Sequence, residues 1–227
     1  AFDPTQVLAG LAKYQALTGD LDTAKAGLGD LAKLAKGFNV DLDKMVGAAG
    51  QVGSAIGEVG EGKAFATSQE KAAAVVDVLK SLTAHGQEGA IEVSDLVVQM
   101  AKVKAAGAAF EGSTADNIKK MGAMAQLSLQ LGGSDSATQA ATSVMGFVST
   151  LKTPARRSQF KAMGVDIDSA TEKGAFADPF EIIKRSLAKT EGDPEKMKKL
   201  FGNVVGERAV TALTNTYNKA GGGDKGM

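Results

Sequence analysis

All four prolines of this 227-residue chain directly follow a side chain that can cap a helix, in the pairs Asp3-Pro4, Thr153-Pro154, Asp178-Pro179 and Asp193-Pro194. Proline is well tolerated at the first position of a helix, because the N–H group that it lacks would have no partner inside the helix there. A preceding Asp or Thr oxygen can accept hydrogen bonds from the N–H groups of the first turn. The pattern therefore predicts four helix starts and leaves no proline to interrupt a helix interior.

The rest of the chain has the same helical pattern. Polar residues that can cap a helix precede apolar residues at 3.6-residue spacing, and glycines follow them as stops. We expect helices over about 4–19, 20–37, 41–49, 67–84, 94–110, 113–132, 134–152, 154–163, from 179, from 194 and over 204–217. Residues 164–178 have no helical spacing and are expected to form an irregular connection. The predicted fold class is all-α, a multi-helix array of short to medium helices joined by Gly- and Pro-marked turns.

Charge and glycine content divide the chain into expected regions. Acidic side chains outnumber basic ones over residues 1–150, and basic ones outnumber acidic ones over 151–208. We expect N-terminal helices with a Gly-rich tract over 1–63, a central helical region over 64–152, a C-terminal helical region over 153–220 and a flexible tail over 221–227.

Composition excludes several function classes. The chain has no Cys, so it has no disulfide, thiolate metal site or cysteine nucleophile, and a single His cannot build a multi-histidine zinc site. With 26 basic and 26 acidic side chains the net charge is zero, which argues against specific nucleic-acid binding. No apolar run is long enough for a standard membrane span. No nucleophile with its base and no paired acid and base stand out, so we expect a protein that is not an enzyme and has no cofactor.

A glycine-rich tract from Gly47 to Gly60 is the first candidate site. Small residues four apart, as in Gly53 and Gly57, let two helices touch along their backbones. Each glycine weakens an isolated helix by roughly 0.5–1 kcal/mol relative to Ala, so such a helix needs a partner. The tract predicts either a helix-packing or membrane seam, or a frayed end of a helix in a single domain. The candidate seam residues are Gly50, Gly53, Gly57 and Gly60.

Basic residues gather at the second proline-started helix and form a candidate contact patch for phosphate or an acidic surface. Its residues are Lys152, Arg156, Arg157 and Lys161. The alternative is a solvated helix face, which is the commoner meaning of such a run. His85, near a predicted helix end, fits a C-terminal capping role better than that of a general base.

Two long segments carry a resemblance to a known family. Residues 8–60 read LAGLAKYQALTGDLDTAKAGLGDLAKLAKGFNVDLDKMVGAAGQVGSAIGEVG, and residues 131–168 read LGGSDSATQAATSVMGFVSTLKTPARRSQFKAMGVDID. They are followed by DPFEIIKRSL from Asp178 and LFGNVVGERAVTAL from Leu200. Together these segments resemble phage tail tape measure proteins over about residues 8–217. The chain lacks the long coiled-coil heptads and the transmembrane hairpin found in other parts of such proteins.

The resemblance implies a structural segment of a longer chain, and the start at Ala1 agrees with that expectation. Tape measure proteins are mainly helical, lie inside the tail tube or tip of the virion, set tail length during assembly and leave during DNA ejection. The implied partners are tail tube and tail-tip proteins, other copies in a homo-oligomer (a trimer by resemblance), and transiently the host membrane. The alternative is a membrane-active helical protein that inserts its Gly-rich segment.

Overall fold

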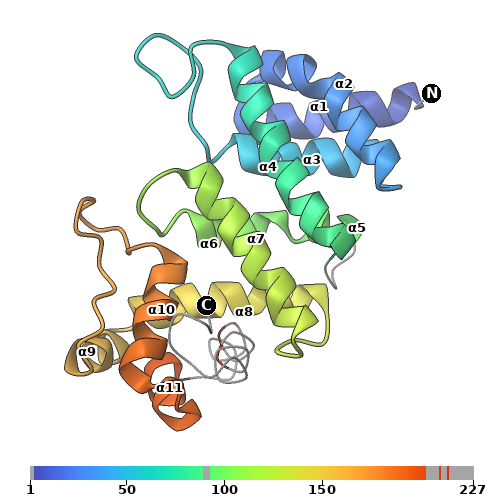
Figure 1. The fold of residues 1–227 in the computed structure, drawn as a ribbon. Helices are drawn as coiled ribbons and strands as arrows, with labels where there is room; N and C mark the ends of the chain where they lie inside the picture. Colours follow the sequence, from blue (N-terminus) through green and yellow to red (C-terminus); the bar gives the residue numbers. More distant parts are fainter. Residues whose placement is uncertain (1–2, 89–92, 203–209, 211–213, 215–227) are drawn as a thin grey trace.

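The computed structural model describes residues 3–88, 93–202, 210 and 214, and this part is mostly helical and contains no β-strand (Figure 1). The predicted all-α fold is thus confirmed. The helices are α1 (Pro4–Thr18), α2 (Leu21–Gly37), α3 (Leu42–Gly53), α4 (Ser68–Glu88), α5 (Val93–Val98), α6 (Met100–Gly107), α7 (Thr114–Gln130), α8 (Ala137–Lys152), α9 (Pro154–Ala162), α10 (Pro179–Thr190) and α11 (Pro194–Phe201).

The proline-marked helix starts are confirmed at α1, α9, α10 and α11, where proline occupies the first turn. The carboxylates of Asp3, Asp178 and Asp193 accept hydrogen bonds from backbone N–H groups of these first turns. Thr153 differs, because its hydroxyl donates back to the Ser149 carbonyl in α8 and makes no capping bond. The proline alone therefore marks the start of α9.

Three expectations about the helices differ from the structure or fall partly outside the described residues. The helix expected over 94–110 is interrupted at Gln99, where the backbone turns between α5 and α6, and α6 ends at Gly107. The Gly-rich tract is helical only to Gly53. The helix expected over 204–217 lies outside the described residues, apart from buried Val210 and Thr214.

The described helices form two neighbouring groups with continuous contact between them (Figure 1). In the first group, α1 packs on α3 and α2 packs on α4. In the second group, α6, α7 and α8 pack together. The two groups meet where α4 contacts α7 and α3 contacts α6. The shorter helices α9 and α11 pack on α8, and α10 reaches α7. The expected boundaries at 63 and 152 lie in the α3–α4 connection and at the α8–α9 junction, and the expected tail over 221–227 lies outside the described residues.

Glycine permits a very close helix contact between α6 and α7. A Cβ atom on Gly107 would lie 2.9 Å from the backbone nitrogen of Ile118 and 3.0 Å from the carbonyl carbon of Asn117. Backbone atoms cannot rotate out of the way as a side chain can, so this crossing requires glycine. By contrast, a Cβ atom on Gly29 of α2 would meet nothing within 4 Å.

A buried ion pair joins α2 to α4. The Lys71 side chain is only 4% exposed, and its ammonium lies 3.2 Å from the Asp20 carboxylate. Asp20 also accepts hydrogen bonds from the backbone N–H and the hydroxyl of Thr23, which caps α2. Partial burial acts to raise the pKa of Asp20, but the Thr23 hydrogen bonds and the Lys71 charge outweigh it and hold this pKa below its usual value. One carboxylate therefore both starts α2 and neutralises a buried cation.

Replacing Asp20 with Asn should lower the free energy of unfolding by about 3 kcal/mol, because Asn can still cap α2 but leaves the buried Lys71 charge without its partner. Chemical denaturation followed by circular dichroism measures this. Asp22→Asn is the control, since Asp22 is 82% exposed and pairs with Lys25 at the surface, and should change stability by less than about 1 kcal/mol.

The same pair predicts a pH dependence. Because the folded-state pKa of Asp20 is depressed, its stabilising contribution is complete above the unfolded-state pKa, about 4, and is lost as pH falls through the lower folded value. The stability difference between the parent chain and Asp20→Asn should accordingly shrink below about pH 4. An unchanged difference down to pH 2 would contradict the pairing.

Candidate functional site

The structure divides the predicted glycine seam into two parts. Gly50 and Gly53 are buried on α3 and face α1 of the same chain. Gly57 and Gly60 lie beyond the end of α3, with φ angles of 121° and 143°, and Gly60 lies in a loop closed by a bridge between Val59 and Phe65. The expectation that Gly53 and Gly57 share one helix face is therefore wrong, because the helix ends at Gly53.

The seam between α1 and α3 contains a buried phenol. A Cβ atom on Gly53 would lie 2.5 Å from the Tyr14 hydroxyl oxygen, and one on Gly50 would lie 3.2 Å from the Tyr14 Cα atom. The Tyr14 side chain is 1% exposed, and its hydroxyl has no hydrogen-bond partner among the described residues. Burial, followed by the nearby Asp20 charge, raises the pKa of Tyr14 far above its usual value. This part of the tract thus lets one chain pack its own helices closely.

The described part of the chain contains no candidate membrane-spanning helix. None of its helices combines the length and the apolar character that crossing a bilayer requires.

Gly50→Ala should lower the free energy of unfolding by about 1–2 kcal/mol, because the added methyl group would press on the α1 backbone and on Leu17. Gly47→Ala on the same helix is the matched control. Its nearest neighbour would be a Lys13 carbon at an ordinary 3.6 Å, so the gain in helix propensity should stabilise the chain by about 0.5–1 kcal/mol. Thermal unfolding of both variants measures the contrast, and equal effects of the two substitutions would contradict a close α1–α3 contact.

Two members of the predicted basic patch are engaged within the chain. The Arg156 guanidinium donates to the carbonyls of Lys199 (2.5 Å) and Gly202 (3.1 Å), and so caps the C-terminal end of α11. Arg157 donates to both oxygens of Asp168 at 2.7 Å and lies over the Phe176 ring, 5.7 Å from its centre. The cluster is therefore not a single row of available cations.

The other two members remain at the surface. Lys152 and Lys161 are exposed, and neither forms an ion pair with a residue that the structure describes. They line different hollows, because Lys152 borders one beside Phe176 and Lys161 borders one of about 620 Å³ beside Asp166 and Asp168. The structure thus does not bring the four predicted basic residues together as one contact site.

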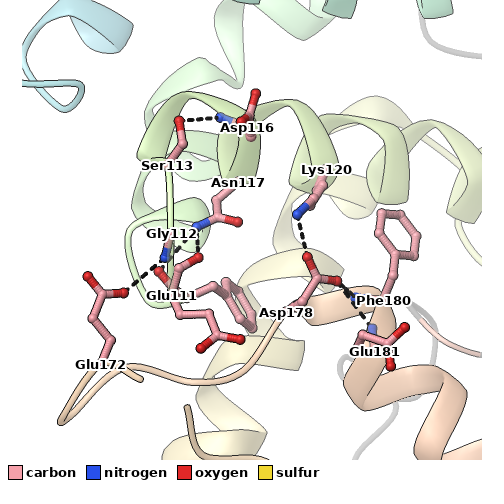
Figure 2. A network of polar contacts seen from close by, with 11 residues as sticks. Glu111, Gly112, Ser113, Asp116, Asn117, Lys120, Glu172, Asp178, Phe180 and Glu181 are labelled. Carbon is pink, nitrogen blue, oxygen red and sulfur yellow. Dashed lines mark hydrogen bonds and ion pairs between the residues drawn. The ribbon is translucent and has the colours of Figure 1, made fainter. Parts of the chain in front are cut away.

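The richest polar arrangement in the described chain surrounds residues 164–178, which we call the strap. The strap joins α9 to α10 and crosses the turn between α6 and α7, as Figure 2 shows. Its Phe176 accepts a backbone hydrogen bond from Glu111 (2.8 Å) and donates one to Ala109 (3.0 Å). Val165, Ile167, Phe176 and Ala177 are buried. The predicted irregular connection is confirmed, but it is anchored along its length.

Two glutamates tie the strap and the α6–α7 turn to each other. The Glu111 carboxylate, on the turn, accepts hydrogen bonds from the hydroxyls of Ser169 and Thr171 on the strap. In the opposite direction, the Glu172 carboxylate on the strap accepts from the Gly112 N–H at 2.9 Å (Figure 2). We call these contacts of Glu111, Gly112, Ser169, Thr171 and Glu172 the latch.

Two further polar groups support the latch from α7. The buried Asn117 amide donates to the carbonyls of Phe110 (3.1 Å) and Glu111 (2.9 Å), which fixes the turn. Lys120 forms an ion pair with Asp178, the residue that caps α10 at the end of the strap (Figure 2). The turn, the middle of the strap and its C-terminal end are therefore held by side chains whose charges and hydrogen bonds are used within the chain.

Two carboxyl groups of this arrangement, those of Glu111 and Asp178, have pKa values below their usual range. The Ser169 hydroxyl, with a smaller contribution from Thr171, lowers the pKa of Glu111. Burial acts to raise the pKa of Asp178, but the Lys120 ammonium and the first-turn N–H groups of α10 outweigh it and lower this pKa. A catalytic acid needs a raised pKa near neutral pH, so neither carboxyl has the character of a general acid.

Asn117→Ala should lower the free energy of unfolding by about 1–3 kcal/mol, because it removes two hydrogen bonds to carbonyls of the α6–α7 turn, which the strap crosses. Gln130→Ala at the exposed end of α7 is the control and should change stability by less than about 0.5 kcal/mol. Urea denaturation of the two variants provides the comparison, and a loss as small as that of the control would show that the amide does not hold the turn.

The described residues contain no cluster of metal-binding side chains. No group of three or more His, Asp or Glu side chains among them could hold a metal ion. The hollow of about 620 Å³ beside the strap contains Arg157 and Asp168, which neutralise each other. His85 belongs to α4, but its side chain lies outside the described part. The contacts at this site hold helices together.

Sequence reasoning missed the latch and identified only the Asp178 cap. The latch residues are 58–60 positions apart along the chain, and no local spacing connects them.

Comparison with family models, with curated proteins and with solved structures gives no match.

Proposed function

We propose that this chain is a structural, non-enzymatic segment of a phage tail tape measure protein, housed in the tail tube or tip. The resemblance of residues 8–60, 131–168, 178–187 and 200–213 to that family carries the proposal. The proposed role is to contribute to the assembly that sets tail length and to leave with it during DNA ejection.

The contacts of the resembling segments support this proposal, because they fix junctions between helices. In the TGDLDTA stretch, the Thr18 hydroxyl accepts from the Asp20 N–H at 3.0 Å, and Asp20 caps α2. In the later segment, Arg157 binds Asp168 and Asp178 caps α10. A protein that serves by its arrangement of helices needs such junctions, whereas an enzyme needs reactive groups gathered in a cleft.

The use of charge is a second supporting observation. The net charge is zero, and many acidic and basic side chains pair within the chain. A surface without strong net charge limits non-specific attraction to DNA or to a charged wall. We therefore expect contact with tail tube and tail-tip proteins, and association with other copies, rather than specific nucleic-acid binding.

The test is to locate the chain in native particles. An antibody raised against it should label the tails of purified particles after the tail tip is opened, and quantitative mass spectrometry should find a small fixed number of copies per particle. Particles from a strain with this coding region deleted are the control. Recovery of the chain only outside tail particles would contradict the proposal, as would its release of dye from lipid vesicles in the absence of any tail association.

A further inference from the structure

The structure points to a releasable unit. We propose that the latch is a conformational device whose opening lets the strap and α9–α11 leave α6–α8 together. This inference does not depend on the proposed function.

The first observation is that arginines bind the strap and the three short helices to one another. Arg156 joins α9 to the end of α11 through the Lys199 and Gly202 carbonyls. Arg157 joins α9 to the strap through Asp168. Arg185 joins α10 to the strap through the Asp166 carbonyl at 3.1 Å. These contacts are internal to residues 154–202 and would survive their departure from the rest of the chain.

The second observation is that the charged and hydrogen-bonding side chains between this unit and the body lie mostly at the surface, whereas its apolar side chains, among them Phe176 and Phe201, are buried against the body. In the latch, Gly112, Thr171 and Glu172 are exposed, and Glu111 and Ser169 are half-buried. Lys120 and Asp178, the remaining ion pair, are 36% and 26% exposed. Water can replace such partners, so these polar contacts oppose local opening less than buried ones would. The N-terminal group, in contrast, is joined through the buried Lys71 and Tyr14.

The third observation is an aromatic stack at the seam that would open. The ring centres of Phe110 in the turn and Phe176 in the strap are 6.1 Å apart, and those of Phe147 in α8 and Phe201 in α11 are 5.8 Å apart. Phe160 of α9 meets Phe201 edge-on at 5.3 Å, so that pair would leave together. Opening would separate Phe176 from Phe110 and Phe201 from Phe147 and would expose apolar surface. Burial of this apolar surface favours the closed state, and the latch adds its polar contacts to it. The same burial favours closure again after the unit has opened.

The experiment compares local opening in two regions of the full chain by hydrogen exchange. Glu111→Gln keeps the size of the side chain but removes the charge that the Ser169 and Thr171 hydroxyls bind, so it should speed exchange of amides in the strap and in α9–α11 about tenfold. Amides of α1–α4 should exchange as in the parent chain. Glu61→Gln, on an exposed loop residue, is the matched control and should change neither region.

A thiol probe gives a second readout, since the chain has no cysteine of its own. Thr150 is 3% exposed under α11 and donates to the Phe201 carbonyl, whereas Ala35 is fully buried in α2. Labelling of a cysteine introduced by Thr150→Cys should become about tenfold faster when Glu111→Gln is added, while labelling of Ala35→Cys should not change.

Three results for Glu111→Gln would overturn the inference. They are no change in either readout, faster exchange in the strap without any change in α9–α11, and an equal increase in all helices, which would indicate global unfolding. Ser169→Ala, which removes the hydroxyl from the other side of the latch, must reproduce the regional pattern of Glu111→Gln. A failure of Ser169→Ala to do so would also overturn the inference.

Discussion

The close approach of glycine-bearing helices is the constraint on which the rest of the structure depends. Aromatic residues make up only 5% of the chain, so few large aromatic side chains are present to fill gaps between helices. At the α1–α3 and α6–α7 crossings, Gly50 and Gly107 bring a neighbouring backbone within the distance that a methyl group would occupy. Dense packing then comes from many short contacts along the helix backbones, each weak and together sufficient to hold the helices.

Where helix packing ends, polar side chains take over. The strap has no helix of its own, yet the latch, Asn117 and the Arg157–Asp168 pair hold it across the α6–α7 turn. Carboxylates that would be candidates for chemistry in another setting are here hydrogen-bonded acceptors with lowered pKa values. The same arrangement explains why the predicted basic patch is not a single binding surface, since two of its residues hold α11 and the strap in place.

The sequence predicts local structure well for a physical reason. Caps and proline starts act within three or four residues, so Asp3-Pro4, Asp178-Pro179 and Asp193-Pro194 could be recognised without any knowledge of the fold. Thr153 shows the limit, because its hydroxyl found a different acceptor in the preceding helix. The break at Gln99 was likewise not evident from the apolar spacing, which continues from α5 into α6.

Long-range partners were not predictable from spacing. The Asp20–Lys71 pair spans 51 positions and the Glu111–Ser169 contact spans 58, and each carboxylate has several equally suitable lysines or hydroxyls nearer in the chain. The glycine tract was recognised as a packing feature, but whether its partner was another helix of the same chain, another copy or a membrane depends on the path of the chain. Only the folded arrangement identifies α1 as the neighbour of Gly50 and Gly53.

The most direct test of the central claim compares one alanine substitution at a helix crossing with one on an open helix face. Gly107→Ala should lower the free energy of unfolding by about 1–3 kcal/mol, because a Cβ atom there meets the α7 backbone. Gly29→Ala, which meets no atom within 4 Å, should raise it by about 0.5–1 kcal/mol through helix propensity. Stabilisation by both substitutions would contradict the account, since it would show that the α6–α7 crossing has room for a side chain.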